Sequence, residues 1–256
     1  TADFPWATIQ TLEKKYDDCP IVYFSGAVGG LMPPPRDGRI KNAEGKTLGE
    51  GDFEFCRLYG EEVGNLAAQA IDTSTPLALS PIAVAAKPIS VPMANPIYQM
   101  GRMLGILKRD GFVWTGNSDE VGPILKRGKS KELPADETEV AYIRLGDLHI
   151  ACMPGEIYPE SVYGQYQEPV EPNADFADAP LEPSIESILP GDKWLMIGLA
   201  NDELGYIVPK RQWDDVAPFA YGRSDKQYGE VNSIGPETAP LLMRALENRV
   251  QEASAK

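Results

Sequence analysis

Three oxygen-bearing side chains lie in turn-rich stretches that follow apolar runs. Glu156 comes directly after Pro154 and Gly155. A carboxylate on such a rigid turn is a common way to place a ligand or an acid–base group. Tyr206 lies in a second loop after an apolar run, and Tyr228 lies in a stretch rich in glycine, serine and asparagine. Tyrosine can donate a proton, stabilise an oxyanion or, rarely, bind a metal. For all three, an ordinary surface or half-buried role is the alternative.

Because His149 is the only histidine in the sequence, several kinds of catalytic or metal site are excluded. It alternates with Leu148 and Ile150 on an expected strand, which is typical of a structural residue of a sheet. One histidine cannot build a multi-histidine zinc site. A Ser-His-Asp triad would have to use it, and no GxSxG motif is present. A further alternative is an N-terminal nucleophile hydrolase, because the sequence starts with Thr1.

Composition narrows the class of partner. The 256 residues carry a formal net charge of −14, so DNA and RNA are not expected partners. Binding to anionic lipid through net charge alone is not expected either, whereas a neutral lipid or a small amide stays open. The three cysteines show no CxxC spacing and indicate neither a disulfide framework nor a cysteine zinc site. No apolar run is long enough to predict a transmembrane segment.

The pattern of apolar and turn residues predicts one α/β domain across residues 1–256, with mixed β-sheets flanked by helices. Helices are expected over residues 1–16, 52–71, 95–107 and 236–250. Phe53 and Leu66 lie on one apolar face of the second of these helices. Strands are expected over residues 20–25, 77–93 and 194–199, with a hairpin over 138–153 that turns at Gly146-Asp147.

Five motifs, taken in order, resemble those of the neutral (non-lysosomal) ceramidases and their bacterial relatives. They span nearly the whole chain and read TADFP, VYFSGAVGGLMPP, CMPGEIYPE, GLANDELGYIVP and YGEVNSIGPETAPLL. The resemblance implies a zinc-dependent hydrolase that cleaves the amide bond of ceramide or a related N-acyl lipid by a metal-activated water. It also implies a secreted or periplasmic setting, and it identifies the chain as the C-terminal portion of a ceramidase-like catalytic domain, that is, a partial hydrolase domain.

The resemblance also implies roles for individual residues. Glu156 matches the glutamate of the PGE motif and Tyr206 the metal tyrosine, so both become zinc ligands. Tyr228 matches a second active-site tyrosine if about ten residues are inserted before it, and with Tyr206 it forms the expected catalytic pair. The substrate would bind along the glycine-rich loop, at Gly29, Gly30 and Met32.

Two departures from the family pattern limit this interpretation. In the segment that matches the GDxSP motif, Gly30 replaces the aspartate and Met32 replaces the active-site serine. Methionine cannot act as a nucleophile or donate a proton, so a catalytically inactive relative that binds a lipid or a protein is the alternative. The family's histidine ligands belong to an upstream portion that this sequence lacks. The zinc ion therefore needs histidines from an upstream segment of the same protein or from a companion chain.

Three structural expectations follow. Glu156 and Tyr206 should converge although they are 50 residues apart in the sequence. Met32 should lie near the same point. The chain alone should not hold zinc tightly, because two protein ligands leave a tetrahedral set half empty.

Overall fold

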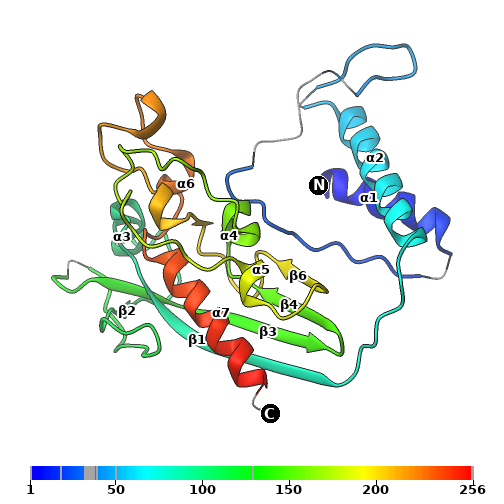
Figure 1. The fold of residues 1–256 in the computed structure, drawn as a ribbon. Helices are drawn as coiled ribbons and strands as arrows, with labels where there is room; N and C mark the ends of the chain where they lie inside the picture. Colours follow the sequence, from blue (N-terminus) through cyan, green and yellow to red (C-terminus); the bar gives the residue numbers. More distant parts are fainter. Residues whose placement is uncertain are drawn as a thin grey trace. The chain divides into compact units, whose positions relative to one another are not determined.

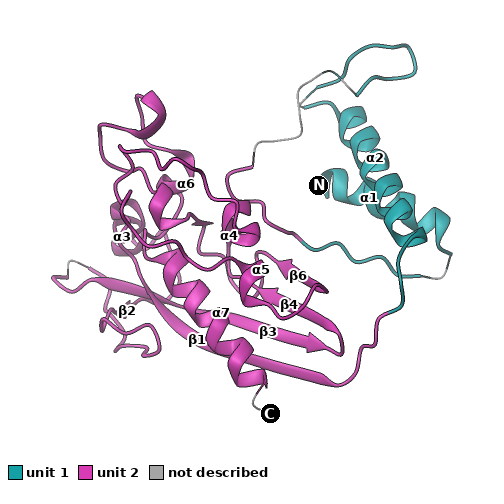
Figure 2. Ribbon diagram, in the orientation of Figure 1, with its two compact units in different colours: residues 1–24, 32–76 teal, residues 25–31, 77–256 magenta. Residues whose placement is uncertain are grey.

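The computed structural model describes residues 2–17, 19–31, 38, 40–49, 51–128 and 130–254. Internal contacts group the chain into two compact units (Figure 2). Unit 1 comprises residues 1–24 and 32–76, and unit 2 comprises residues 25–31 and 77–256. The sequence predicts a single domain, and that expectation stays a prediction.

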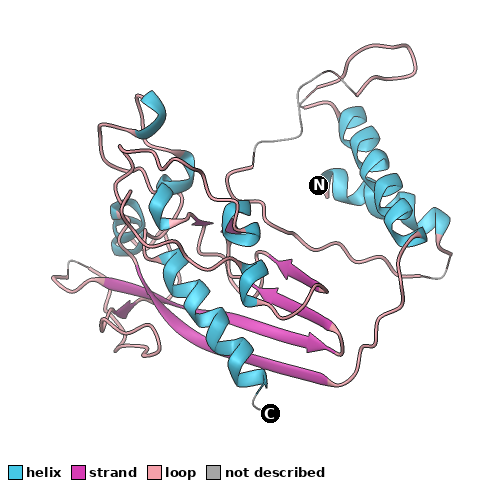
Figure 3. Cartoon of the chain, viewed as in Figure 1, coloured by secondary structure: helices cyan, strands magenta, loops and turns pink. Residues whose placement is uncertain are grey.

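The chain contains both helices and strands, as expected for the predicted α/β class (Figure 3). The helices are α1 (Asp3–Lys15), α2 (Phe53–Asp72), α3 (Pro96–Met103), α4 (Pro159–Tyr163), α5 (Ile185–Ile188), α6 (Tyr228–Val231) and α7 (Thr238–Ser254), with short 3-10 turns η1 (Lys210–Gln212) and η2 (Ala220–Gly222). The strands are β1 (Ile82–Pro92), β2 (Phe112–Val113), β3 (Pro134–Leu145), β4 (Leu148–Cys152), β5 (Glu156–Ile157), β6 (Trp194–Ile197) and β7 (Tyr206–Ile207). None of the described helices has the length and hydropathy needed to cross a membrane.

Unit 1 is built on α1 packed against α2, and the contact runs through two glycines of α2. A Cβ on Gly60 would lie 2.4 Å from the carbonyl oxygen of Phe4, and one on Gly64 would lie 2.8 Å from the Cβ of Thr11. Only a glycine leaves room for such a close approach. The prediction that the face of α2 with Phe53 is the apolar, packed one is therefore wrong, since Phe53 is 82% exposed. Helical periodicity predicted that the larger apolar residues of α2 are buried, but α1 packs against the small residues Gly60 and Gly64 instead.

Unit 2 contains a five-stranded mixed sheet with the order β1-β3-β4-β6, in which β2 also pairs with β3 (Figure 1). β1, β3 and β4 are antiparallel neighbours, and β6 runs parallel to β4. Leu145 pairs with Leu148, so the predicted hairpin with its turn at Gly146 and Asp147 is confirmed. The proline-containing strand β1 lies at an edge of the sheet, where a missing N–H is tolerated.

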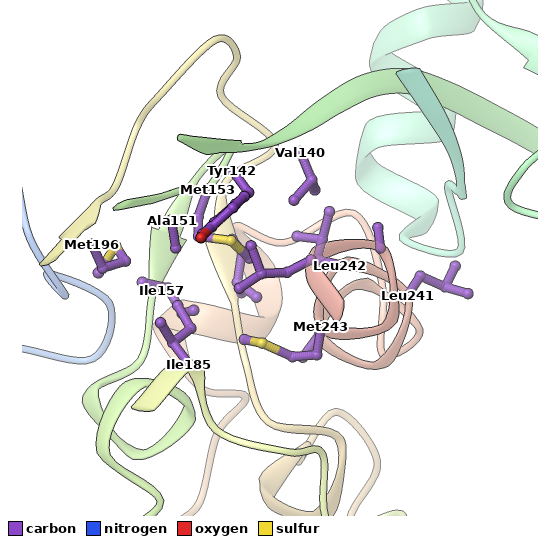
Figure 4. Close-up of a cluster of buried hydrophobic side chains, with 14 of the residues drawn as sticks. Val140, Tyr142, Ala151, Met153, Ile157, Ile185, Met196, Leu241, Leu242 and Met243 are labelled. Atoms are coloured by element: carbon purple, nitrogen blue, oxygen red, sulfur yellow. The ribbon is translucent and has the colours of Figure 1, made fainter. Parts of the chain in front are cut away.

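One face of this sheet packs against α7 to form the main core (Figure 4). Tyr142 of β3 and Met153, which follows β4, lie beside Leu242 of α7. The exposed fractions of these three side chains are 1%, 0% and 0%. Burying an apolar side chain of this size contributes about 1.5–3 kcal/mol, so α7 and the sheet stabilise one another.

Residues 20–25 do not form the buried strand that their apolar character predicts. Val22, Tyr23 and Phe24 are exposed, and no described strand pairs with them. The backbone N–H of Gly198 does donate to the carbonyl oxygen of Ser25, at 2.8 Å. Apolar content alone does not make a strand, because a strand also needs a neighbour for its backbone donors and acceptors.

Truncation of a core side chain of α7 should destabilise unit 2. Leu246 is fully buried in the main core, so Leu246→Ala should lower the free energy of unfolding by about 2–5 kcal/mol. Gln251, exposed on the same helix, supplies the control, and Gln251→Ala should change stability by less than about 0.5 kcal/mol. Urea unfolding curves measure both, and equal effects would contradict the assignment of this core.

Candidate active site

The structure brings Glu156 and Tyr206 together on two short parallel strands. Glu156 of β5 is the direct register partner of Tyr206 of β7. The backbone N–H of Glu156 donates to the carbonyl oxygen of Gly205 at 3.0 Å, and that of Tyr158 donates to Ile207 at 3.3 Å. Neighbouring strands lie about 4.8 Å apart, so the two side chains emerge next to each other. The predicted convergence of these residues is therefore present in the fold.

Glycines on either side of this strand pair permit very close backbone packing. The N–H of Gly29 donates to the carbonyl oxygen of Ile157 at 2.9 Å. A Cβ on Gly29 would lie only 2.3 Å from the carbonyl oxygen of Glu156. Gly205 has φ +84, and a Cβ there would meet the carbonyl oxygen of Asn232 at 2.0 Å. Any larger residue at either position would displace the strand that carries Glu156 or Tyr206.

The carboxylate of Glu156 lies close enough to the hydroxyl of Tyr206 to influence its titration. Burial, followed by the negative charge of Glu156, raises the pKa of Tyr206 to about 12. Tyr206 therefore keeps its proton at neutral pH and acts as a hydrogen-bond donor. Tyr206 can become an anionic metal ligand only if a cation displaces the proton from its hydroxyl.

Two further tyrosines surround Tyr206. The ring of Tyr228 lies edge-on to it, with ring centroids 5.7 Å apart, and the ring of Tyr158 does the same at 6.4 Å. Tyr228 is 73% exposed, whereas burial raises the pKa of Tyr158 well above its usual range. The sequence interpretation missed Tyr158. Its spacing of two from Glu156 was the available signal, because residues i and i+2 of a strand share a face.

A cavity of about 260 Å³ lies beside β5. It is lined by Gly29, Gly30, Leu31, Tyr158, Pro159, Glu160, Tyr163 and Gln165. The two glycines predicted to contact substrate thus lie at a concave surface, next to the strand of Glu156. Met32, predicted at the same place, and Thr1, considered as a nucleophile, lie outside the described residues.

The loop that leads to Tyr206 is held by two charged contacts. The guanidinium of Arg109 forms a 2.7 Å ion pair with Asp202 and also donates to the carbonyl oxygen of Glu137 of β3, at 2.7 Å. The carboxylate of Glu203 accepts a hydrogen bond from the N–H of Gly205 at 2.6 Å. Burial would raise the pKa of Asp202, but the hydrogen bond from Arg109 holds it below its usual value. Tyr206 is thereby fixed relative to the main sheet.

A buried acidic pair lies behind Tyr228. Glu230 and Asp214 are 3% and 1% exposed. The Oε1 of Glu230 accepts a hydrogen bond from the N–H of Asp214 at 3.2 Å, while its Oε2 has no partner among the described residues. Asp214 in turn accepts a hydrogen bond from the N–H of Ala220 at 3.0 Å. Burial raises the pKa of Glu230 to about 7, so its carboxyl keeps its proton into the neutral range.

His149 is not part of this site. It lies at the start of β4, in register with Trp194, and its Nδ1 is 2.5 Å from the hydroxyl of Tyr142. This agrees with the structural role that its strand pattern indicates. Across the described parts of the chain, no three His, Cys, Asp or Glu side chains gather closely enough to hold a metal ion. Glu156 and Tyr206 supply oxygen donors that fit part of a zinc ligand set but do not complete it.

Among solved structures, the fold is similar to that of neutral ceramidase from Pseudomonas aeruginosa. The match has a TM-score of 0.59 and 13% sequence identity, and it covers 100% of this chain and 41% of the ceramidase chain. The chain thus spans less than half the length of that protein, and the likeness concerns the fold. No protein-family model matches the sequence, and no curated protein matches it significantly.

The contact between Glu156 and Tyr206 predicts a coupled titration. Glu156→Gln removes a negative charge that raises the pKa of Tyr206, so that pKa should fall below about 12. Tyrosinate absorbance during an alkaline titration measures it, and the difference from a Tyr206→Phe variant isolates the residue among the 11 tyrosines. Glu160→Gln, a change of a cavity carboxylate outside this pair, is the control. An unchanged Tyr206 titration in Glu156→Gln would contradict the contact.

The buried carboxyl of Glu230 predicts stability that falls as the pH rises. Its pKa is about 7 in the folded chain against an ordinary value of 4.5. The stabilisation is complete below pH 4.5, declines as the pH rises, and is lost above about 7, with a total on the order of 3 kcal/mol. Glu230→Gln should remove most of this decline in urea unfolding measured at several pH values. Glu186→Gln, at an exposed glutamate of α5, should leave it in place, and a decline equal to wild type in Glu230→Gln would refute this role.

Proposed function

We propose that this chain is the part of a zinc-dependent amide hydrolase that supplies Glu156 and Tyr206 to the metal site. The single observation that supports the proposal is the register pairing of these two residues on strands held by Gly29 and Gly205. The proposed substrate class is ceramide or a related N-acyl lipid. That class rests on the similarity of fold to neutral ceramidase and on the ordered sequence motifs.

Each residue has a distinct proposed role. Glu156 and Tyr206 bind the zinc ion together with histidines from outside this chain. Bound zinc would supply a Lewis acid that lowers the pKa of a water molecule. The exposed hydroxyl of Tyr228, whose ring lies against that of Tyr206, is placed to donate a hydrogen bond to the oxyanion that develops at the amide carbon. Gly29 and Gly30 line the cavity that receives part of the substrate.

The competing function is a catalytically inactive relative that binds a lipid or a protein. Its motivation is the sequence at Gly30 and Met32, where the family pattern has an aspartate and a serine. An inactive relative would retain the fold and the cavity beside β5 but would not turn over substrate. Intact zinc binding together with hydrolysis of a fluorescent N-acyl lipid would exclude it.

Zinc affinity tests the proposed ligand set. The 256-residue chain alone should bind zinc more weakly than about 1 μM, because two oxygen ligands leave the tetrahedral set half empty. Expression together with the polypeptide that carries the histidines should give about one tightly bound zinc per complex and amide hydrolysis. Isothermal titration and elemental analysis measure the metal, and release of the fatty acid measures the reaction.

Two variants and a control assign the ligands. Within the active complex, Glu156→Ala and Tyr206→Phe should each lower zinc affinity by at least about ten-fold, whereas Glu160→Gln should not. If the isolated chain binds one zinc at submicromolar affinity, or if Glu156→Ala retains full zinc content, the ligand set is different and the proposal is wrong.

A further inference from the structure

A patch of exposed aliphatic side chains borders the candidate active site. It lies on α3 and on the loops next to it and comprises Ile97, Met100, Leu104, Ile106 and Ile124, whose exposed fractions are 53%, 52%, 62%, 70% and 67%. At about 100° per residue, the first three share one face of the helix. Arg102, in contrast, is 4% exposed. A helix that turns its arginine inward and its aliphatic residues outward reverses the usual pattern of a water-facing helix. We name these five residues the α3 patch.

Direct contacts hold the two loops of the α3 patch together. The guanidinium of Arg127 donates to the carbonyl oxygen of Lys108 at 3.3 Å. The N–H of Leu125 donates to the carbonyl oxygen of Gly111 at 2.8 Å, and Ile124 forms a β-bridge with Phe112. In Figure 1 both loops lie around β2, at the end of the sheet where β1 leads into α3. The aliphatic side chains of residues 104–106 and 124 therefore belong to one surface.

The loops of the α3 patch carry more basic than acidic side chains, although the chain as a whole is acidic. Lys108, Lys126 and Arg127 are exposed, and none forms an ion pair with any residue that the structure describes. Residues 104–131 contain six basic and three acidic residues, whereas the whole chain has 24 basic and 38 acidic ones. Exposed aliphatic side chains on loops that also carry unpaired cations are a combination that can bind an anionic lipid interface.

An ion pair and a hydrogen bond connect α3 and the loops next to it to the segments that hold the candidate active site. Arg109, next to Lys108, makes the 2.7 Å ion pair with Asp202 in the loop that leads to Tyr206. Asn95 at the start of α3 donates through its amide to the carbonyl oxygen of Ser233, at 2.8 Å. On the inner side of α3, the hydroxyl of Tyr98 lies within 3.1 Å of where a Cβ on Gly205 would be.

We propose that the α3 patch docks on an anionic lipid surface. Leu104, Ile106 and Ile124 enter the interface, and the cations of the same loops contact lipid phosphates. The net charge of −14 does not prevent this, because at physiological salt acidic residues farther away than about 8–10 Å are largely screened. Delivery of a lipid to the site rests on the proposed function, whereas the docking itself does not.

Vesicle sedimentation of the 256-residue chain tests the docking. Vesicles of phosphatidylcholine mixed with phosphatidylglycerol should bind the chain more strongly than phosphatidylcholine alone, and added salt should weaken the binding. Each cation contributes about a five-fold increase in partitioning, so the double variant Lys126→Gln, Arg127→Gln should bind roughly 20-fold more weakly. Ile106→Asp should weaken binding by roughly ten-fold or more, because the inserted aliphatic surface is lost.

Matched controls lie at the opposite end of the sheet. Leu79→Asp changes an exposed leucine and Lys193→Gln an exposed lysine, both outside the α3 patch, and neither should alter vesicle binding. Circular dichroism checks that every variant keeps its fold. Glu156→Ala should bind vesicles normally, so full hydrolysis by a complex that carries Glu156→Ala would sink the proposed function and leave the docking standing.

Three outcomes would overturn the docking proposal. The first is equal binding to neutral and anionic vesicles, or no binding to either. The second is an equal loss of binding in the control variants. The third is a stable dimer of the chain that Ile106→Asp dissociates, because the α3 patch would then be a protein interface.

Discussion

The candidate site depends on how closely three stretches of backbone approach one another around β5 and β7. Gly29 lies against the carbonyl of Glu156, and Gly205 lies against the carbonyl of Asn232, both at separations that exclude a Cβ. Two short strands of two residues each could not hold this register through their own hydrogen bonds. Their alignment is enforced from outside by the glycine-rich loop on one side and by the segment before α7 on the other.

This packing places a carboxylate among tyrosines in a partly desolvated setting. Burial of Tyr206, together with the negative charge of Glu156, raises the pKa of the phenol and keeps it protonated. The hydroxyl of Tyr206 therefore lies beside the carboxylate of Glu156, whose negative charge opposes formation of the phenolate unless a cation binds there. A metal that binds to this pair must therefore displace a proton, so its affinity is tied to pH. Glu156 and Tyr206 alone supply fewer ligands than a tetrahedral zinc site needs.

The same loops that fix Tyr206 also carry surface features of a different kind. Arg109 connects the loop of Tyr206 to the sheet and to the loop that exposes Ile106. The similarity of fold to a ceramidase extends over 41% of that protein's chain. If both proposals hold, the α3 patch and the proposed zinc ligands lie on one unit, so that docking on a lipid surface would bring the lipid close to the site.

Sequence alone determined the α/β class, the hairpin at Gly146 and the start of α3 at Asn95. It also singled out Glu156 and Tyr206, the residues that pair between β5 and β7. These depend on local signals such as turn chemistry, capping and alternation of apolar residues, which act over a few positions. Tertiary structure decided which face of α2 is buried, the exposure of residues 20–25, and the gathering of Tyr158 and Tyr98 about the site. These outcomes depend on which partner surface is present, and contacts between residues distant in sequence leave no periodic signal in a single chain.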